Sequence, residues 1–248
     1  MAETNAIRDY IFKQREEARN VFDEQHRSLI DEAVAEIGRP YSFLVTAVIE
    51  GADLRPGPRF DGFALVKSAL ESLVSSLQLS RDGAQLDALA LLRVAVEACC
   101  VAVHIIESPE AYERYAGRRS RPYDSNRAIS FSKKRIHRVE KFWSILSNAA
   151  IHPSRRFYGP QPLDDGSLSV RFGPIVLNSR DCELLMLILS IAALIVQRAC
   201  EVVLLVDDNQ RDGWLRLVGT NFIATAHGNT FLKRKFDELD AFTATGLA

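Results

Sequence analysis

Residues 84–107 would be apolar on nearly every side if they formed a helix. Most surface helices keep a polar face, whereas a helix without one has to be covered all round. The sequence therefore predicts that this helix lies in the middle of a bundle. Two charged residues, Arg93 and Glu97, stand one helical turn apart within it. Its apolar positions include Leu86, Leu89, Leu91, Leu92, Val94, Val96, Val101, Val103 and Ile105.

Helical periodicity predicts the elements around this central helix. A long amphipathic helix is expected over residues 3–37, and Gly38 and Pro40 are expected to end it. A helix over 60–79 is joined to the central one by a short connection, so the two should pack antiparallel. Residues 117–132 show no convincing period and are predicted to form a loop. Further helices are expected at 41–50, 110–115, 133–150, 179–206, 214–222 and 231–242.

Between these helices, residues 155–174 change pattern to short alternating segments around an Asp-Asp-Gly turn, which predicts a small β-hairpin. A lone hairpin is not stable by itself, so it is expected to be an insertion. The fold class predicted is all-α, an antiparallel helical bundle with this hairpin near 155–174. One domain is expected over 1–248, with the N-terminal helix at 3–37, the bundle core at 60–206 and a C-terminal helical segment at 212–242.

The composition excludes several classes of protein. The formal net charge of -1 gives no overall attraction to nucleic acids or anionic membranes. No signal peptide or membrane anchor is recognisable, and the apolar stretch 184–196 is shorter than a membrane span requires. A cytoplasmic protein without a membrane partner is expected. The cysteines lie in apolar surroundings without metal-ligand spacing, so buried thiols, no metal and no cofactor are predicted: Cys99, Cys100, Cys182 and Cys200.

Arg93 and Glu97 are the first candidate site residues. Their spacing puts both on one face of a helix, so they should interact. One interpretation is an internal salt bridge that fixes the register of the bundle, because an unpaired buried charge is costly. The other is a polar functional site inside the bundle.

His152 is the next candidate, at the end of the helix predicted over 133–150. A histidine there can be a simple cap, favoured as a cation by the helix dipole. It can equally have a catalytic or binding role, and Ser147 and Asn148, about one turn earlier, could share its face.

Together these motifs resemble bacterial helical-bundle proteins placed near the HEPN superfamily. The similarity is carried by Leu-Leu-Arg-x-x-x-Glu-Ala around Arg93, Ser-Pro-Glu at 108–110, and Leu-Ser-x-x-x-x-His-Pro-Ser at 146–154. HEPN ribonucleases imply an all-α dimer, often linked to defence, that cuts RNA without a metal through an arginine, a polar residue and a histidine. Asn148 fits the polar position, but Ser147 stands where the arginine is expected. Arg93 is the hypothetical substitute, which would make Arg93, Glu97, Asn148 and His152 the catalytic set.

A second stretch satisfies the arginine-to-histidine spacing formally, from Arg19-Asn20 to His26. About one and a half such matches are expected by chance in a chain of this composition. It also falls on a charged amphipathic segment, where a solvated helix face is the ordinary explanation.

The basic run at 118–141 is the third candidate, with Tyr123, Phe131 and His137 interleaved as possible stacking groups. A solvated surface is one interpretation, and binding of RNA or another polyanion is the other. The residues that would carry such binding are Arg118, Arg119, Arg121, Lys133, Lys134, Arg135, Arg155 and Arg156.

Three functions remain open from the sequence. The first is an RNA-interacting protein, either a divergent metal-independent endoribonuclease or a relative that only binds. The second is a non-enzymatic dimerising scaffold, in which Arg93, Glu97 and His152 only fix the packing. The third is a small-molecule hydrolase with Glu97 and His152 as acid and base.

Overall fold

The computed structural model describes residues 8–49, 55–119, 121–150, 161–162, 168–169, 177–204 and 225–244 of the chain. Within these residues the fold is an all-α helical bundle, as predicted. Its centre is an antiparallel pair, α4 (Pro58–Arg81) and α5 (Gln85–Glu107), joined by a tight turn in which Gly83 has a φ of 78°. The positive φ explains the glycine at this turn, because other residues adopt it only with strain.

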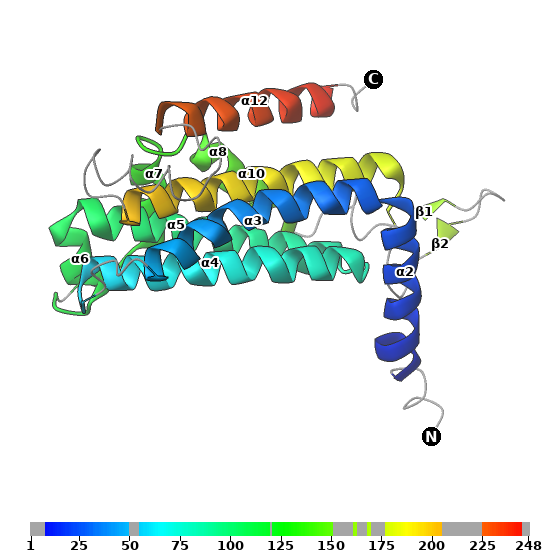
Figure 1. Cartoon of the computed structure of the whole chain (residues 1–248), viewed down its shortest axis with the longest axis horizontal. Coiled ribbons are helices and arrows are strands. Elements are labelled where there is room, and N and C mark those ends of the chain that lie inside the picture. The colour runs from blue at the N-terminus through cyan, green and yellow to red at the C-terminus, as the bar shows by residue number, and fades with distance from the viewer. Residues whose placement is uncertain are drawn as a thin grey trace.

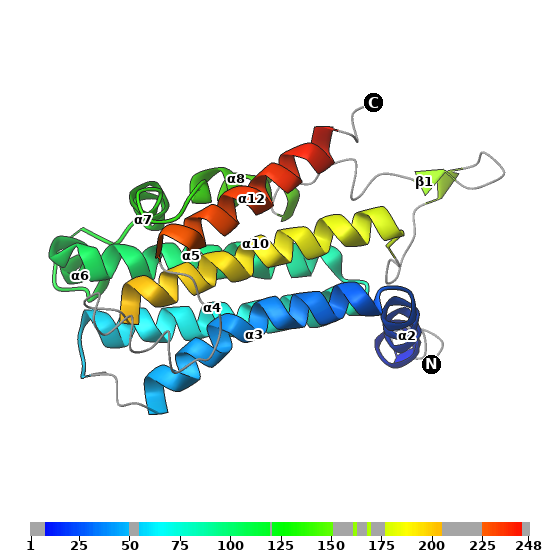
Figure 2. The ribbon, with the colours of Figure 1, turned by 45° about the horizontal axis from the view of Figure 1, so that its top comes forward.

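Two further long helices, α3 (Arg27–Ile49) and α10 (Ser179–Leu204), run beside this pair (Figures 1 and 2). α10 packs against α3, α4 and α5, and most of its residues are buried. Asn178 caps it by accepting a hydrogen bond from the Asp181 backbone N–H at 2.9 Å. Both α5 and α10 are long and apolar enough to span a membrane, but the apolar stretch of α10 is covered by the bundle, as expected of a core helix.

The interior also contains the four cysteines as free thiols. Burial raises the pKa of the Cys99 and Cys200 thiols well above the usual value, because the thiolate would be stripped of water. The prediction of buried thiols is confirmed, and the raised pKa disfavours the thiolate, which is the nucleophilic form.

The N-terminal region differs from the single helix expected over 3–37. It begins with the π-helical turn η1 (Tyr10–Gln14) and continues as α2 (Arg15–Gln25), which lies across one end of the bundle (Figure 1). The break is at His26, which is 4% exposed and packs edge-on against Phe22, with ring centroids 5.1 Å apart. A buried histidine at the bend lets α3 turn onto the bundle.

Gly38 and Pro40 do not end a helix, because α3 continues to Ile49. Proline removes one helical hydrogen bond and costs about 3 kcal/mol in a helix interior. Here Phe43 and Leu44, just beyond it, are buried in the core, and that packing offsets the cost. α3 bends along its length, as a proline-containing helix is expected to do (Figure 2).

Three short helices cover the other side of α5: α6 (Pro109–Tyr115), α7 (Ser125–Ser132) and α8 (Val139–Ala150). Ser108 caps α6 by accepting a hydrogen bond from the Ala111 N–H at 3.2 Å, as the sequence suggested. The loop predicted over 117–132 is wrong in its second half, which forms α7. That helix is stabilised by an Asp124 cap and by the burial of Ala128 and Ile129.

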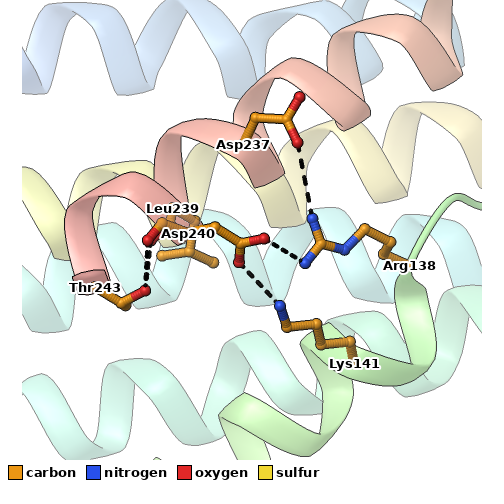
Figure 3. Close-up of polar contacts among 6 residues, drawn as sticks. All are labelled: Arg138, Lys141, Asp237, Leu239, Asp240 and Thr243. Atoms are coloured by element: carbon orange, nitrogen blue, oxygen red, sulfur yellow. Dashed lines mark hydrogen bonds and ion pairs between the residues drawn. The ribbon is translucent and has the colours of Figure 1, made fainter.

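The last helix, α12 (Thr225–Ala244), lies along the outside of α10. It contains the expected segment 231–242, whereas the expected segment 214–222 lies outside the described residues. Figure 3 shows how Arg138 and Lys141 hold it: both reach Asp240, at 2.7 and 2.9 Å, and Arg138 also approaches Asp237. Phe236 is fully buried beneath these ion pairs.

The only strands in the described part of the chain are two residues each, β1 (Gln161–Pro162) and β2 (Leu168–Ser169). They pair antiparallel, with Gln161 opposite Ser169 and Pro162 opposite Leu168. This contact is much shorter than the hairpin expected over 155–174, and most of that range lies outside the described residues. The hairpin therefore stays a prediction.

Candidate functional site

Arg93 and Glu97 lie on the side of α5 that meets α8, and neither is sealed in the core. Their side chains are 26% and 27% exposed, and Arg93 Nη2 lies 3.7 Å from Glu97 Oε2. The interaction expected from their spacing is present as an ion pair, too long for a direct hydrogen bond. The neighbouring positions Leu92, Ala95 and Val96 are fully buried. The pair therefore stands at the edge of the core.

Two residues of α8 hold the Arg93 guanidinium. Arg93 Nε donates a hydrogen bond to Ser147 Oγ at 3.0 Å. The guanidinium carbon lies 5.0 Å from the centre of the Trp143 ring, a cation–π contact. Trp143 and Ser147 are four residues apart on α8, so they share one face. Arg93 is thereby fixed on three sides, by Glu97, Trp143 and Ser147.

Trp143 has one unusual property. Its indole Nε1 is buried and has no hydrogen-bond partner among the described residues. Buried donors are nearly always paired in folded proteins. The side chain whose ring contacts Arg93 thus carries a donor that has no acceptor among the described residues.

Asn148, the residue in the polar position of the motif, is exposed at the end of α8. His152 follows two residues after the end of α8 and lies outside the described residues, as do Arg155 and Arg156. The structure brings Arg93, Glu97 and Ser147 together and leaves the contacts of His152 untested.

This arrangement can bind an anion. A guanidinium has five N–H donors in a planar fork, and here one is used by Ser147. Its contacts restrict its rotation, so little further entropy is lost when it binds a phosphate or carboxylate. Glu97 balances the charge of Arg93, so the specificity of such a site would come from geometry more than from net potential.

Most of the basic run at 118–141 is paired with carboxylates. Arg135 contacts Glu107 at 2.6 Å, Arg118 contacts Glu113 at 3.0 Å and Arg119 lies 3.6 Å from Glu110. Lys133 lies 3.4 Å from Glu140, and Arg138 and Lys141 face α12. The fold therefore brings in acidic groups from other elements and weakens the positive potential that the sequence suggested.

Two members of the run lack such a carboxylate in the described part of the chain, Arg121 and Lys134. Arg121 is exposed beyond the end of α6, whereas Lys134 lies over the Phe131 ring, with Nζ 5.4 Å from its centre. The stacking group expected at Phe131 therefore has a cation beside it.

The formal match from Arg19 to His26 has a structural explanation. Arg19 pairs with Asp82 at 2.6 Å, and His26 Nε2 lies 3.4 Å from the carbonyl oxygen of Leu177. The histidine is buried at the α2–α3 bend. The motif was expected to be a solvated face, which holds for Arg19 but is wrong for His26.

No metal site is found in the described residues, in which no three metal-ligating side chains meet. The sequence did not single out Trp143, whose ring contacts the Arg93 guanidinium. Its position four residues before Ser147 was the available signal, because it puts both on the face that would meet Arg93.

Comparison of the chain with protein-family models, curated proteins and solved structures finds no match.

Proposed function

We propose that the protein acts on RNA as a metal-independent endoribonuclease related to the HEPN type, in which an arginine from another helix replaces the one missing from the motif. The observation that supports this most directly is the 3.0 Å hydrogen bond from Arg93 Nε to Ser147 Oγ. Ser147 occupies the position of the motif arginine, five residues before His152. A guanidinium is therefore present next to the expected position, although it comes from α5.

In this proposal Arg93 binds the scissile phosphate and stabilises the charge that develops on it. Glu97, Trp143 and Ser147 are positioning residues for the guanidinium. Asn148 supplies the polar contact of the motif, and His152 moves the proton between the ribose hydroxyl and the leaving oxygen. Fixed donors aimed at developing charge are among the largest contributions to catalysis.

Cleavage of a structured RNA in the presence of a metal chelator tests the proposal. The wild-type protein is expected to cleave, and Arg93→Ala and His152→Ala are each expected to lose about 100-fold or more of the rate. Arg39→Ala is the matched control, because Arg39 also pairs with a glutamate on its own helix, at 3.0 Å, but lies away from the site. Cleavage that persists in Arg93→Ala and His152→Ala would point to a contaminating nuclease and contradict the proposal. An equal loss of cleavage in Arg39→Ala would point to general instability and contradict it as well.

A dimerising scaffold is the second candidate function, favoured by an exposed apolar stripe on α3. Val34, Tyr41, Val45 and Val48 are between 37% and 58% exposed and recur at helical spacing. Sedimentation of the wild type and of Val45→Asp would detect a dimer that depends on this stripe. Val74→Asp on α4 is the control, because Val74 is 42% exposed, close to the 37% of Val45. A monomer at all concentrations would exclude this function.

A further inference from the structure

A pocket of about 480 Å³ opens between the C-terminal end of α5 and helices α6 and α7. Its walls include His104 from α5, Arg114 from α6, Tyr123 from the connection, and Arg127 and Phe131 from α7, with Lys134 just beyond α7. The volume lies in the range of about 300–1,000 Å³ typical of small-molecule sites. These residues are far apart in sequence, and the fold gathers them.

One wall of the pocket is aromatic. The centres of the His104 and Phe131 rings lie 4.7 Å apart, and the two rings are tilted by 33° to each other. Lys134 Nζ lies 5.4 Å from the centre of the Phe131 ring. The Tyr123 hydroxyl lies 2.9 Å from His104 Nδ1 and fixes the orientation of the imidazole. A planar group can stack on such a wall beside a cation.

The pocket is also electropositive. Four cations line it, Arg114, Arg127, Lys133 and Lys134, against two carboxylates, Glu110 and Asp124, so the formal balance is 4 − 2 = +2. The carboxylates pair with Arg114 and Arg127, and Lys133 pairs with Glu140 outside the pocket. In the described part of the chain no carboxylate lies within ion-pair distance of Lys134.

Two polar groups in the walls have capacity left for a ligand. Arg114 Nε is buried without a hydrogen-bond partner in the described residues, an uncommon and costly state. Burial, followed by the charges of Arg114 and Arg127, lowers the pKa of His104, while burial raises the pKa of Tyr123. At neutral pH a protonated phenol can therefore donate to Nδ1 of a neutral imidazole, which leaves the His104 Nε2–H as a free donor.

This pocket is separate from the Arg93 site. His104 is eleven residues after Arg93 on α5, about 16 Å along the helix axis. Between them α7 covers α5: Ser132 is fully buried and its hydroxyl donates to the Cys100 carbonyl at 3.1 Å. The pocket is therefore a second site with its own walls.

We propose that this pocket binds a small phosphorylated ligand that carries a planar ring. The ring stacks on Phe131 and His104, and the phosphate pairs with Lys134 and the arginine side chains at the rim. One ligand that carries both features can use both contacts at once, because the cation and the aromatic face are adjacent at Phe131.

Isothermal titration calorimetry of the full chain tests the proposal with three probes. Adenosine monophosphate has both features, adenosine lacks the phosphate, and inorganic phosphate lacks the ring. The monophosphate is expected to bind about tenfold or more tightly than either of the others. Lys134→Ala and Phe131→Leu are each expected to weaken it about tenfold, whereas Lys67→Ala, an exposed lysine of α4, should bind as the wild type does.

Three results would overturn the proposal: no binding of the monophosphate, equal binding of all three probes, or binding unchanged in both Lys134→Ala and Phe131→Leu. Thermal melting of each variant identifies any that has unfolded. If Phe131→Leu is unfolded, Phe131→Tyr is used in its place: it keeps an aromatic ring and is expected to retain binding. Arg93→Ala should bind the monophosphate as the wild type does, because Arg93 does not line this pocket, so the outcome here is independent of the function proposed for the Arg93 site.

Discussion

The Arg93 side chain is held by three contacts and is still partly exposed to solvent. Its position in the sequence predicts only the contact with Glu97. Its pairing with Glu97 follows from the spacing of four residues on a helix. The contacts with Ser147 and Trp143 depend on how α8 packs against α5, which no local pattern contains. Arg93 therefore has features of both interpretations: it forms an ion pair at the edge of the core, and it is still reachable from solvent.

A buried ion pair in α10 shows the opposite case. Arg198 and Glu201 are each 6% exposed, they contact each other, and Arg198 Nε donates to the Arg135 carbonyl at 3.2 Å. In the sequence, these two charges follow the apolar stretch 184–196. Removing only one of such a pair leaves a buried charge without its partner, which is strongly destabilising.

The pair between Asp23 of α2 and Arg81 of α4 gives a pH-dependent prediction. Two hydrogen bonds from the Arg81 guanidinium reach the carboxylate, one of them at 2.6 Å. The hydrogen bonding holds the pKa of Asp23 below its usual value near 3.8, against a smaller opposing effect of burial. Asp23→Asn is therefore expected to lower the free energy of unfolding by about 1 kcal/mol at pH 7, since the pair is partly exposed to solvent.

The sign of this effect follows from proton linkage. Because the folded-state pKa of Asp23 is lowered, its contribution is fully present above the unfolded value and is lost as the pH falls through the folded value. Urea unfolding of both proteins should therefore show a difference at pH 7 that shrinks below about pH 4. A difference that grows in acid would contradict the assignment. Glu71→Gln, in an exposed pair with Lys67, is the control and should have almost no effect.

At the scale of elements, periodicity predicted the core helices better than the outer ones. The helix expected over 3–37 breaks at His26, and the one expected over 133–150 begins only at Val139. The long helices α4, α5 and α10 agree with the predictions to within a few residues. α7 was missed because an eight-residue helix owes its stability to packing on α5 and to its Asp124 cap. α3 passes Pro40 for the same reason, since its buried face outweighs one lost hydrogen bond.

Two helical glycines give a matched test of packing between elements. A Cβ atom on Gly62 of α4 would lie 3.3 Å from side-chain atoms of both Ile106 and Val203, whereas one on Gly38 of α3 would meet nothing within 4 Å. Gly62→Val is expected to cost about 1–3 kcal/mol through overpacking. Gly38→Ala is expected to stabilise by about 0.5–1 kcal/mol, because glycine is a poor helix former.

Chemical denaturation of both variants measures these values. If Gly62→Val is as stable as the wild type, α4 does not approach α5 and α10 as closely as described. If Gly38→Ala destabilises the protein, the continuation of α3 through this position is wrong.

The attachment of α12 can be tested separately from global stability. Hydrogen bonds from Lys141 and Arg138 hold the pKa of Asp240 below its usual value near 3.8 (Figure 3). Asp240→Asn should weaken these contacts and increase amide hydrogen exchange in α12, while the exchange of α5 stays unchanged. Glu238→Gln, on the same helix, is the control, because among the described residues Glu238 pairs with Arg234 and Lys235 of α12 itself. Equal exchange in wild type and Asp240→Asn would show that the buried residues Leu232, Phe236 and Leu239 hold the helix without these ion pairs.

In the whole molecule, α5 is the central helix of the bundle and contributes residues to both candidate sites, the Arg93 site and the pocket at His104. Arg93, Glu97 and His104 lie close to one face of this helix, and the covering helices α6, α7 and α8 leave that face accessible at two places. The sequence predicted a central helix with a polar pair. It could not predict the pocket at His104, because its walls come from three elements that only the folded chain brings together.

The central claim, that Arg93 replaces the motif arginine, is tested most directly by moving the guanidinium back. Arg93→Ala should abolish chelator-resistant RNA cleavage, and the double variant Arg93→Ala, Ser147→Arg should recover it at least in part, since residue 147 lies within hydrogen-bond distance of the original guanidinium. Cleavage by Arg93→Ala at the wild-type rate, or a folded double variant that stays as inactive as Arg93→Ala, would contradict the claim.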